Sequence, residues 1–456
     1  MFIAQMNCPN FRVLSDFRKV HGGLFQDCFK QTVKLAMELK LASLGHISLD
    51  GSKVKANTSK HKGTSKNTPA ASCLRKYRHQ PPPETAPMLC QRHPGLFDLH
   101  DRAAKLTALG DPLVTLKAEI DFEAFRADLA RVHEKPRKSN AGAKPFDVVL
   151  MFMVLILQHL YNLSDDGIEY QIRDRLSFMR FLGLQLEDRV PDAKTVWLFR
   201  ERLKGLELVE VLFARFDEQL AQRGYVAKAG QMIDATFVEA PRQRNTREEN
   251  AKIKAGELPD GWDDPEQAAR HRQKDTDARW TKKNDETYYG YKNHLNADAA
   301  TKLIQHYVVT PANVHDSQVF DELLDTETRT AEDRKRPVYA DSAYRSAERE
   351  ADLAKQGLES QIHEKGTRAA PLTEDQKASN RKKSTVRARV EHIFGAQAAM
   401  DGHVIRTIGL ARAKVKIGLL NLTYNMKRLV QLTAIETRRL AGLAAGLGGI
   451  TAPVVA

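Results

Sequence analysis

The sequence has few cysteines, and their spacing excludes the usual disulfide and zinc scaffolds. Only four of the 456 residues are cysteine. These four, Cys8, Cys28, Cys73 and Cys90, include no CxxC pair. His93 lies near Cys90, but no second pair completes a tetrahedral zinc site. We therefore expect reduced thiols that mostly pack against other side chains, which favours a cytosolic protein.

Long hydrophobic runs are also missing. The longest spans Val148–Leu157 and stops at Gln158, whereas a helix that crosses a bilayer needs about 20 apolar residues. The first turns carry Arg12, Asp16 and Arg18, so they do not resemble a secretory signal. We expect no membrane partner.

What the sequence has in excess is positive charge. Seventy-one Lys and Arg stand against 58 Asp and Glu, which gives a net charge of +13. A basic excess of this size favours polyanionic partners, because bound phosphates release their counterions. An apolar content of 42% is enough for at least one large core, and the length suggests two or three domains.

Composition divides the chain into segments. An N-terminal fragment looks folded, a Pro-rich stretch without periodicity looks like a linker, and a helical region is followed by mixed strands and helices. The segments are 1–62 (fragment), 63–110 (linker or junction), 111–226 (all-helical domain), 229–435 (α/β catalytic domain, with a polar insertion at about 242–284) and 436–456 (tail). The helical domain fits a packing scaffold or a helix-turn-helix reader of DNA, and no residue marks a recognition helix.

The α/β segment begins with three successive strands, after which strands alternate with helices. This order predicts a sheet that is antiparallel on one side and parallel on the other. The expected strands are 231–238, 288–297, 302–309, 337–341 and 360–363, with helices at 317–324 and 346–356.

Three acids in this segment form a candidate site. Asp234 ends the apolar half of its strand and Asp341 directly follows Val338–Ala340, at points where a lone Asp is most often a turn former or helix cap. Glu391 lies on the helix that carries Val390 and Ile393 and, taken alone, would be a solvated surface charge. Three crowded carboxylates repel one another and would raise their pKa values, so the trio indicates a cation site.

The residue types suit phosphoryl transfer. Charge builds on the attacking, leaving and nonbridging oxygens of such a reaction, and two divalent ions about 3.5–4 Å apart stabilise both ends of the displacement. Mg²⁺ prefers oxygen ligands and keeps several waters, so a few carboxylates suffice.

The motifs resemble bacterial insertion-sequence transposases of the DDE type, specifically the insertion sequence five family. The similar stretches, in family order, are 231–236 (QMIDAT), 289–294 (YGYKNH), 310–316 (TPANVHD), 339–344 (YADSAY) and 389–395 (RVEHIFG), within a match over about 115–435. The resemblance implies an RNase H-like core with Asp234 and Asp341 on adjacent strands and Glu391 on the following helix. It also implies Mg²⁺ or Mn²⁺ dependence, with two ions, and binding to inverted-repeat DNA ends.

The last motif departs from the family pattern. Related transposases often have a Tyr and a Lys flanking its Arg and Glu, whereas here Ser384 precedes Arg387 and Ala398 follows Glu391. Basic residues near the acids are candidates for DNA contacts, although a charge run alone is usually a solvated face. The candidates are Lys382, Arg387 and Arg389 before Glu391, and Lys292 and His294 on one face of a strand.

These expectations combine into one function. We expect a DNA transposase that cleaves and transfers strands at inverted-repeat ends, acts as a homodimer on DNA, and is cytoplasmic in a bacterium, at the nucleoid when bound. One alternative is a catalytically defective chimera that still binds DNA; another is a structure-selective nuclease with the same fold. Trp262 and Trp280 either form a small local core or stack on an extruded base.

The front of the chain supports the chimera. Residues 10–18 and 45–57 resemble a second insertion-sequence transposase family, in which Asp50 would be the first catalytic acid. Because Asp50 lies across the Pro-rich junction from the only Asp341 and Glu391, we expect Asp234 to be used and residues 1–62 to be a remnant.

Overall fold

The computed structural model describes Gln31 and residues 98–134, 144–225, 229–262, 264–266, 271–283, 285–326, 336–366 and 371–447. Contacts divide the chain into two units, residues 1–92 and 93–456, and every described residue except Gln31 belongs to the second unit. The fragment with Asp50 therefore lies outside the described residues, apart from Gln31.

The part before the sheet is helical, as predicted. Its helices are α3 (Asp98–Ala108), α4 (Pro112–Glu119), α5 (Arg126–Ala130), α6 (Val148–Leu160), α7 (Asp165–Asp174), α8 (Leu176–Leu182), α9 (Ala193–Gly205) and α10 (Leu208–Gln222), with short 3₁₀ turns at Glu123–Phe125 and Arg131–His133. The central helix α6 is apolar on nearly all sides and almost wholly buried, and Asp147 caps it by accepting from the backbone N–H groups of Val149 and Leu150.

Helix α3 corrects one predicted boundary. It begins at Asp98, inside the stretch 63–110 predicted as a linker. Leu99, Ala103 and Leu106 recur at helical spacing, so this end of the stretch has an apolar stripe that the Pro-rich composition nearby concealed.

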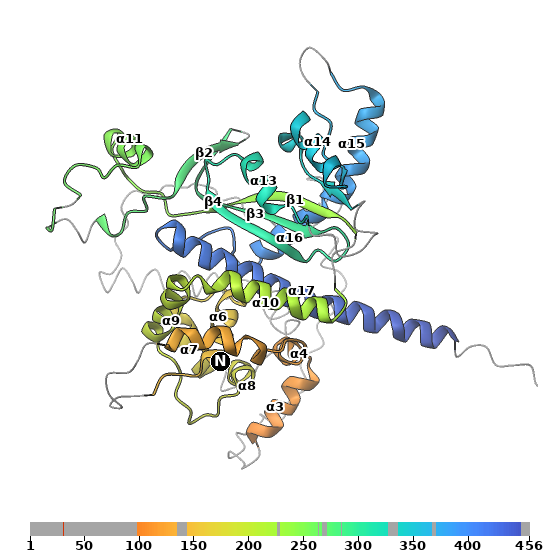
Figure 1. The fold of residues 1–456 in the computed structure, drawn as a ribbon. Coiled ribbons are helices and arrows are strands. Elements are labelled where there is room, and N and C mark those ends of the chain that lie inside the picture. The colour runs from red at the N-terminus through yellow and green to blue at the C-terminus, as the bar shows by residue number, and fades with distance from the viewer. Residues whose placement is uncertain are drawn as a thin grey trace, which may run out of the picture. The chain divides into compact units, whose positions relative to one another are not determined.

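The sheet has six strands in the order β2-β3-β1-β5-β6, with β4 also paired to β3 (Figure 1). The strands are β1 (Gln231–Glu239), β2 (Arg279–Lys283), β3 (Glu286–Asp298), β4 (Ile304–Pro311), β5 (Pro337–Tyr339) and β6 (Glu359–Ser360). Strand β3 is antiparallel to β1, β2 and β4, whereas β5 is parallel to β1 and β6. The predicted mixed sheet is confirmed, and the insertion at 242–284 contributes one strand to it.

The remaining helices lie between the strands and after them. They are α11 (Arg247–Ala255) in the insertion, then α13 (Phe320–Leu323), α14 (Ala347–Lys355), α15 (Glu374–Arg387), α16 (Arg389–Ala398) and α17 (Leu410–Leu447), with 3₁₀ turns at Asp316–Val319 and Ser342–Tyr344. Helix α17 continues past the predicted domain end at 435 into the segment predicted as a tail.

Helix α17 joins the sheet to the helical part. It contacts α4, α6, α9 and α10 on one side and β3, β4 and α16 on another, and Figure 1 shows it running between α10 and the sheet. One apolar core contains side chains from all of these regions, among them Phe152, Leu212, Met232, Leu295 and Leu422. The sheet and the helical part therefore share a core.

A ladder of amides fixes α17 against β3 and β4. Asn421 and Asn293 exchange hydrogen bonds of 2.9 and 3.1 Å, and Gln397 donates to the same Asn421 oxygen at 2.7 Å. Asn425 accepts from the Ile304 N–H and donates to the Ile304 carbonyl. All of these side chains are buried, so their bonds specify one register between helix and strands.

No single helix among the described residues is long and apolar enough to cross a membrane. Helices α6 and α7 pass such a test only as a pair bent by 102°, and α6 is occupied by the protein core.

We predict that Asn421→Ala lowers the free energy of unfolding by about 2–4 kcal/mol, because it leaves the buried amides of Asn293 and Gln397 without their partner. Urea denaturation measures the change. Thr437→Ala, at an exposed position of the same helix, is the control and should cost less than about 1 kcal/mol. Equal losses in the two variants would show that the amide ladder does not stabilise the fold.

Candidate active site

Asp234 lies in β1, on the face of the sheet that α16 covers. Asp234 is two residues after Met232, so both side chains point to the same face of the strand. The side chain of Met232 shares a core with Val390 and Ile393 of α16. One carboxylate oxygen accepts from the Ala235 N–H at 2.9 Å. Burial raises the pKa of Asp234, against the opposing effect of the Ala235 N–H and of nearby cations.

Asp341 comes two residues after β5, the parallel neighbour of β1. The pairing joins Gln231 to Val338 and Met232 to Tyr339, which are 107 residues apart, as Asp234 and Asp341 are. Asp341 caps the next 3₁₀ turn, where its Oδ1 accepts from the Ser342 N–H. One acid thus lies inside β1 and the other just beyond the neighbouring strand β5.

Glu391 reaches this region from the first turn of α16. Helix α16 contacts β1, and the charge of Glu391 acts on Asp234, whose pKa it raises as a secondary effect after burial. Its side chain is exposed.

Arg387, the last residue of α15, forms an ion pair with Asp234. Its Nη1 lies 3.0 Å from Asp234 Oδ2, and both side chains are largely buried. The Arg387 Nε has no hydrogen-bond partner among the described residues. One oxygen of the first predicted acid is therefore held by a cation of the protein itself.

The acids suit a hard divalent cation in chemistry but are not gathered around one point. Carboxylate oxygens are the ligands that Mg²⁺ and Mn²⁺ prefer, and burial of Asp234 disfavours its charge unless a cation is close. Within the part of the chain that the structure describes, no three His, Cys, Asp or Glu side chains lie close enough to hold one ion. The residue types thus fit such a cation, whereas the side chains of Asp234, Asp341 and Glu391 do not surround one point in this conformation.

Lys292 and His294 lie in the central strand β3 and not at an exposed edge. Lys292 donates to Asp316 Oδ1 at 2.8 Å and to the Val314 carbonyl at 2.7 Å. His294 is fully buried, and its Nε2 lies 2.8 Å from Thr310 Oγ1. Both predicted DNA contacts are therefore engaged inside the protein.

Tyr344 connects this group to the acids. Its hydroxyl is buried and has no hydrogen-bond partner among the described residues. Burial raises the pKa of Tyr344, and the carboxylates of Asp316, Asp234 and Asp341 raise it further, so all three lie near the phenol. The sequence assigned no role to Asp316 or Tyr344, although they are the last residues of the motifs 310–316 and 339–344.

His363, just beyond β6, is another neighbour that sequence reasoning missed. Burial lowers its pKa, as does Arg387, while Asp341 opposes the shift. Ser384 lies 3.2 Å from His363 Nε2, so the residue that departs from the family pattern joins α15 to the end of β6. The position of His363 after a strand was the available signal.

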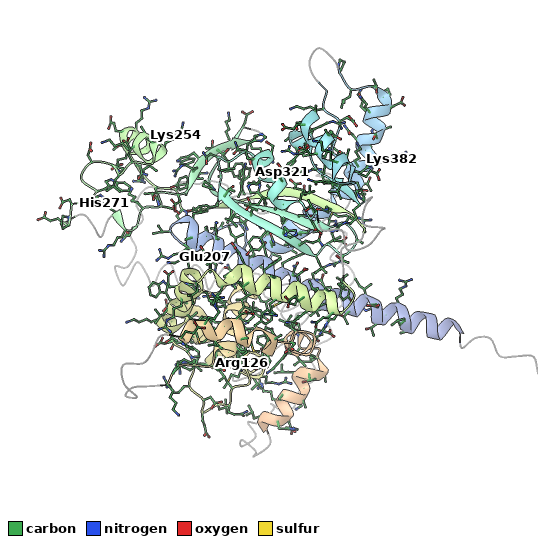
Figure 2. The ribbon with its side chains drawn as sticks, in the orientation of Figure 1. Arg126, Glu207, Lys254, His271, Asp321 and Lys382 are labelled. Carbon is green, nitrogen blue, oxygen red and sulfur yellow. The ribbon has the colours of Figure 1, made fainter. Side chains whose placement is uncertain are left out.

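The other predicted DNA contacts are exposed. Lys382 lies on α15, which has no buried side chain (Figure 2). Arg389 is exposed at the start of α16 and donates to the Ala299 carbonyl at 2.8 Å.

The two tryptophans of the insertion differ in their surroundings. Trp262 is buried, stacks on His271 with ring centroids 4.8 Å apart, and donates to Glu249, which makes a small local core. Trp280 is 44% exposed and packs against Tyr289.

His294 should make the fold sensitive to acid. Burial, aided by the charge of Lys292, lowers its pKa from 6.5 to about 4, against the opposing effect of Asp316. A depressed folded-state pKa stabilises the fold above pH 6.5, and this stability is lost as the pH falls through about 4. The linkage is worth up to about 3 kcal/mol.

We predict that wild-type protein loses more unfolding free energy between pH 7 and pH 4 than His294→Gln does, by an amount that approaches this limit. Urea denaturation across the range measures it. His306→Gln, at an exposed position of β4, is the matched control and should keep the wild-type slope. If His294→Gln also kept that slope, the imidazole would not be the titrating group.

Comparisons with known families cover both halves of the described unit. Residues 227–426 match the family described as "Transposase DDE domain", and residues 100–202 match the family described as "Transposase domain (DUF772)". Among solved structures, the chain is similar to the cryo-EM structure of the piggyBac transposase synaptic complex with hairpin DNA, at 13% identity and a TM-score of 0.37, over 75% of this chain and 86% of that one. Over these ranges the chain is thus similar to a transposase DDE domain and, before it, to a second transposase domain.

Proposed function

We propose that the chain is a DNA transposase of the insertion sequence five family, which cleaves and transfers strands at the inverted-repeat ends of an insertion sequence. Its catalytic residues are Asp234, Asp341 and Glu391, on an RNase H-like core. The observation that supports the proposal is the parallel pairing of β1 and β5, since Asp234 lies in β1 and Asp341 two residues beyond β5, within the range that matches the transposase DDE domain.

The acids would hold the metal. Asp234 and Asp341 offer oxygens from adjacent strands, and Glu391 would complete the set from α16. Mg²⁺ or Mn²⁺, in two ions, would stabilise the charge that develops on the phosphate oxygens. The chain's own part is to fix the carboxylates and to bring basic groups to the DNA.

In this proposal Arg387 has two alternative partners, the Asp234 carboxylate and a DNA phosphate. Its guanidinium neutralises Asp234 in the protein alone, and a DNA phosphate is an equally good acceptor for it. A phosphate that draws Arg387 away would free the Asp234 carboxylate for a cation. Lys382 and Arg389, both exposed, would contact the DNA backbone.

In this proposal, Lys292 and His294 do not contact DNA and instead stabilise an acid near the site. Because Lys292 pairs with Asp316 and His294 packs beside it, they balance the charge of an acid that lies near Tyr344. We assign them to support of the acids; a direct contact with DNA would first require the ion pair to open.

We predict that Asp234→Asn, Asp341→Asn and Glu391→Gln each reduce strand cleavage by at least about 100-fold while DNA binding stays within a few-fold, because the acids act on the transition state and the basic residues carry the affinity. Cleavage of end-labelled DNA with Mg²⁺ or Mn²⁺ measures the rate. Asp260→Asn, an exposed carboxylate in the insertion, is the control. A variant that cleaves at the wild-type rate would remove its residue from the site.

The same assay separates the alternatives. A defective chimera derived from two transposases would bind DNA and leave it intact under every metal condition. A structure-selective nuclease would cut DNA without regard to its end sequence. The proposed transposase, acting as a homodimer on DNA at the bacterial nucleoid, requires the cognate ends and joins them to a second DNA.

A further inference from the structure

Three cations gather at the turn between β3 and β4, outside the group of acids. Lys302 lies in this turn, Arg389 begins α16, and Arg428 comes from α17. Lys302 Nζ lies 3.2 Å from the Nδ1 of His392, the next residue but two after Arg389. Three elements far apart in sequence thus contribute nitrogen groups to one place.

The turn itself holds the two guanidinium groups. Arg389 Nη1 donates to the Ala299 carbonyl at 2.8 Å, and Arg428 Nε donates to the Thr301 carbonyl at 2.7 Å. The Tyr424 hydroxyl donates to the Lys302 carbonyl at 2.9 Å, which fixes the turn. These bonds use only part of each guanidinium fork, so N–H groups remain for a ligand.

No acidic side chain among the described residues forms an ion pair with Lys302, Arg389 or Arg428. The nearest acid of the turn, Asp298, is buried and already accepts from the Ala300 and Thr301 N–H groups. Burial, Arg428 and Arg389 together lower the pKa of Lys302, so the three positive charges oppose one another. An anion would relieve that repulsion.

We propose that Lys302, Arg389 and Arg428 form a binding site for a backbone phosphate of DNA. This inference rests on the proposed function and adds a composite site to it, since only Arg389 stood out in the sequence. Arg389 lies two residues before Glu391 in the first turn of α16, and side chains at this spacing point to different sides of a helix, so the bound phosphate would sit on another side of this turn than the third acid. The site would hold DNA beside the reacting phosphodiester without taking part in the chemistry.

The geometry favours a phosphate over other anions. Guanidinium groups present paired donors that match phosphate oxygens, and anchoring them to carbonyls lowers the entropy lost on binding. Lys302 adds a point charge. The contact with His392 Nδ1 keeps the Lys302 amine near the guanidinium groups when no ligand is present.

The test is the salt dependence of binding to a DNA duplex. Each lost phosphate contact should reduce the slope of log K against log salt by about one unit. We expect this loss for Arg428→Gln and for Lys302→Gln, and about two units for the double variant. Arg438→Gln, at an exposed position of the same helix α17, should keep the wild-type slope.

Two further measurements make the result decisive. Arg428→Lys keeps the charge and should keep most of the slope, so its retention shows that Arg428→Gln acts through charge. Thermal unfolding checks that each variant folds; if Arg428→Gln does not, Lys302→Gln carries the test alone. Wild-type slopes in the folded Gln variants would overturn the phosphate site. If the wild type binds DNA with the expected salt dependence and the Gln variants lose slope, but the wild type does not cleave DNA, the proposed function is overturned and the phosphate site is not.

Discussion

The contact on which the rest of the structure depends is that of α17 with the sheet. This helix of 38 residues is the last element of the described chain, yet its first half lies in the core between the helical part and strands β3 and β4. At Gly418 the approach is so close that a Cβ atom would lie 2.5 Å from the Tyr307 hydroxyl and 2.7 Å from Val209. Because apolar packing alone tolerates sliding of a helix, the buried amides of Asn421 and Asn425 have a specific value: they are satisfied in one register only.

The strands β1 and β5 and the helix α16 hold the candidate acids. Asp234 and Asp341 are set by main-chain pairing of β1 and β5, which leaves their separation little freedom. Glu391 depends on α16, whose Val390 and Ile393 pack into the core, and on the link to α15. Helix α15 has no fully buried residue and is attached to residues 362–364 mainly by polar bonds from Asn380 and Lys383. An element attached in this way moves at low cost, so the side of the site that brings Arg387 is the adjustable one.

Much of this frame was predictable from the sequence, because it rests on local patterns. The strand 231–238 and the alternation of strands with helices follow from hydrophobic periodicity, whereas the acids were chosen from motif order and from their positions on the predicted elements and stay a prediction. The helix inside the predicted linker was missed because its apolar stripe of Leu99, Ala103 and Leu106 is short and follows Pro-rich sequence. The contribution of β2 to the sheet was missed because a strand such as Arg-Trp-Thr-Lys-Lys has no apolar alternation, and only pairing with β3 defines it.

The charges were harder to predict, since a charge has meaning only through its partner. In the sequence, nothing distinguishes the basic residues Lys292 and Arg387 from Lys302 and Arg428. In the structure, Lys292 pairs with Asp316 and Arg387 with Asp234. Lys302 and Arg428 come from a turn and a helix 126 residues apart, and the structure places them together without a carboxylate. An isolated cation at the surface costs nothing, because water solvates it. Half-buried cations held together by carbonyl groups do cost free energy, and a fold that keeps them is one in which an anion repays that cost on binding.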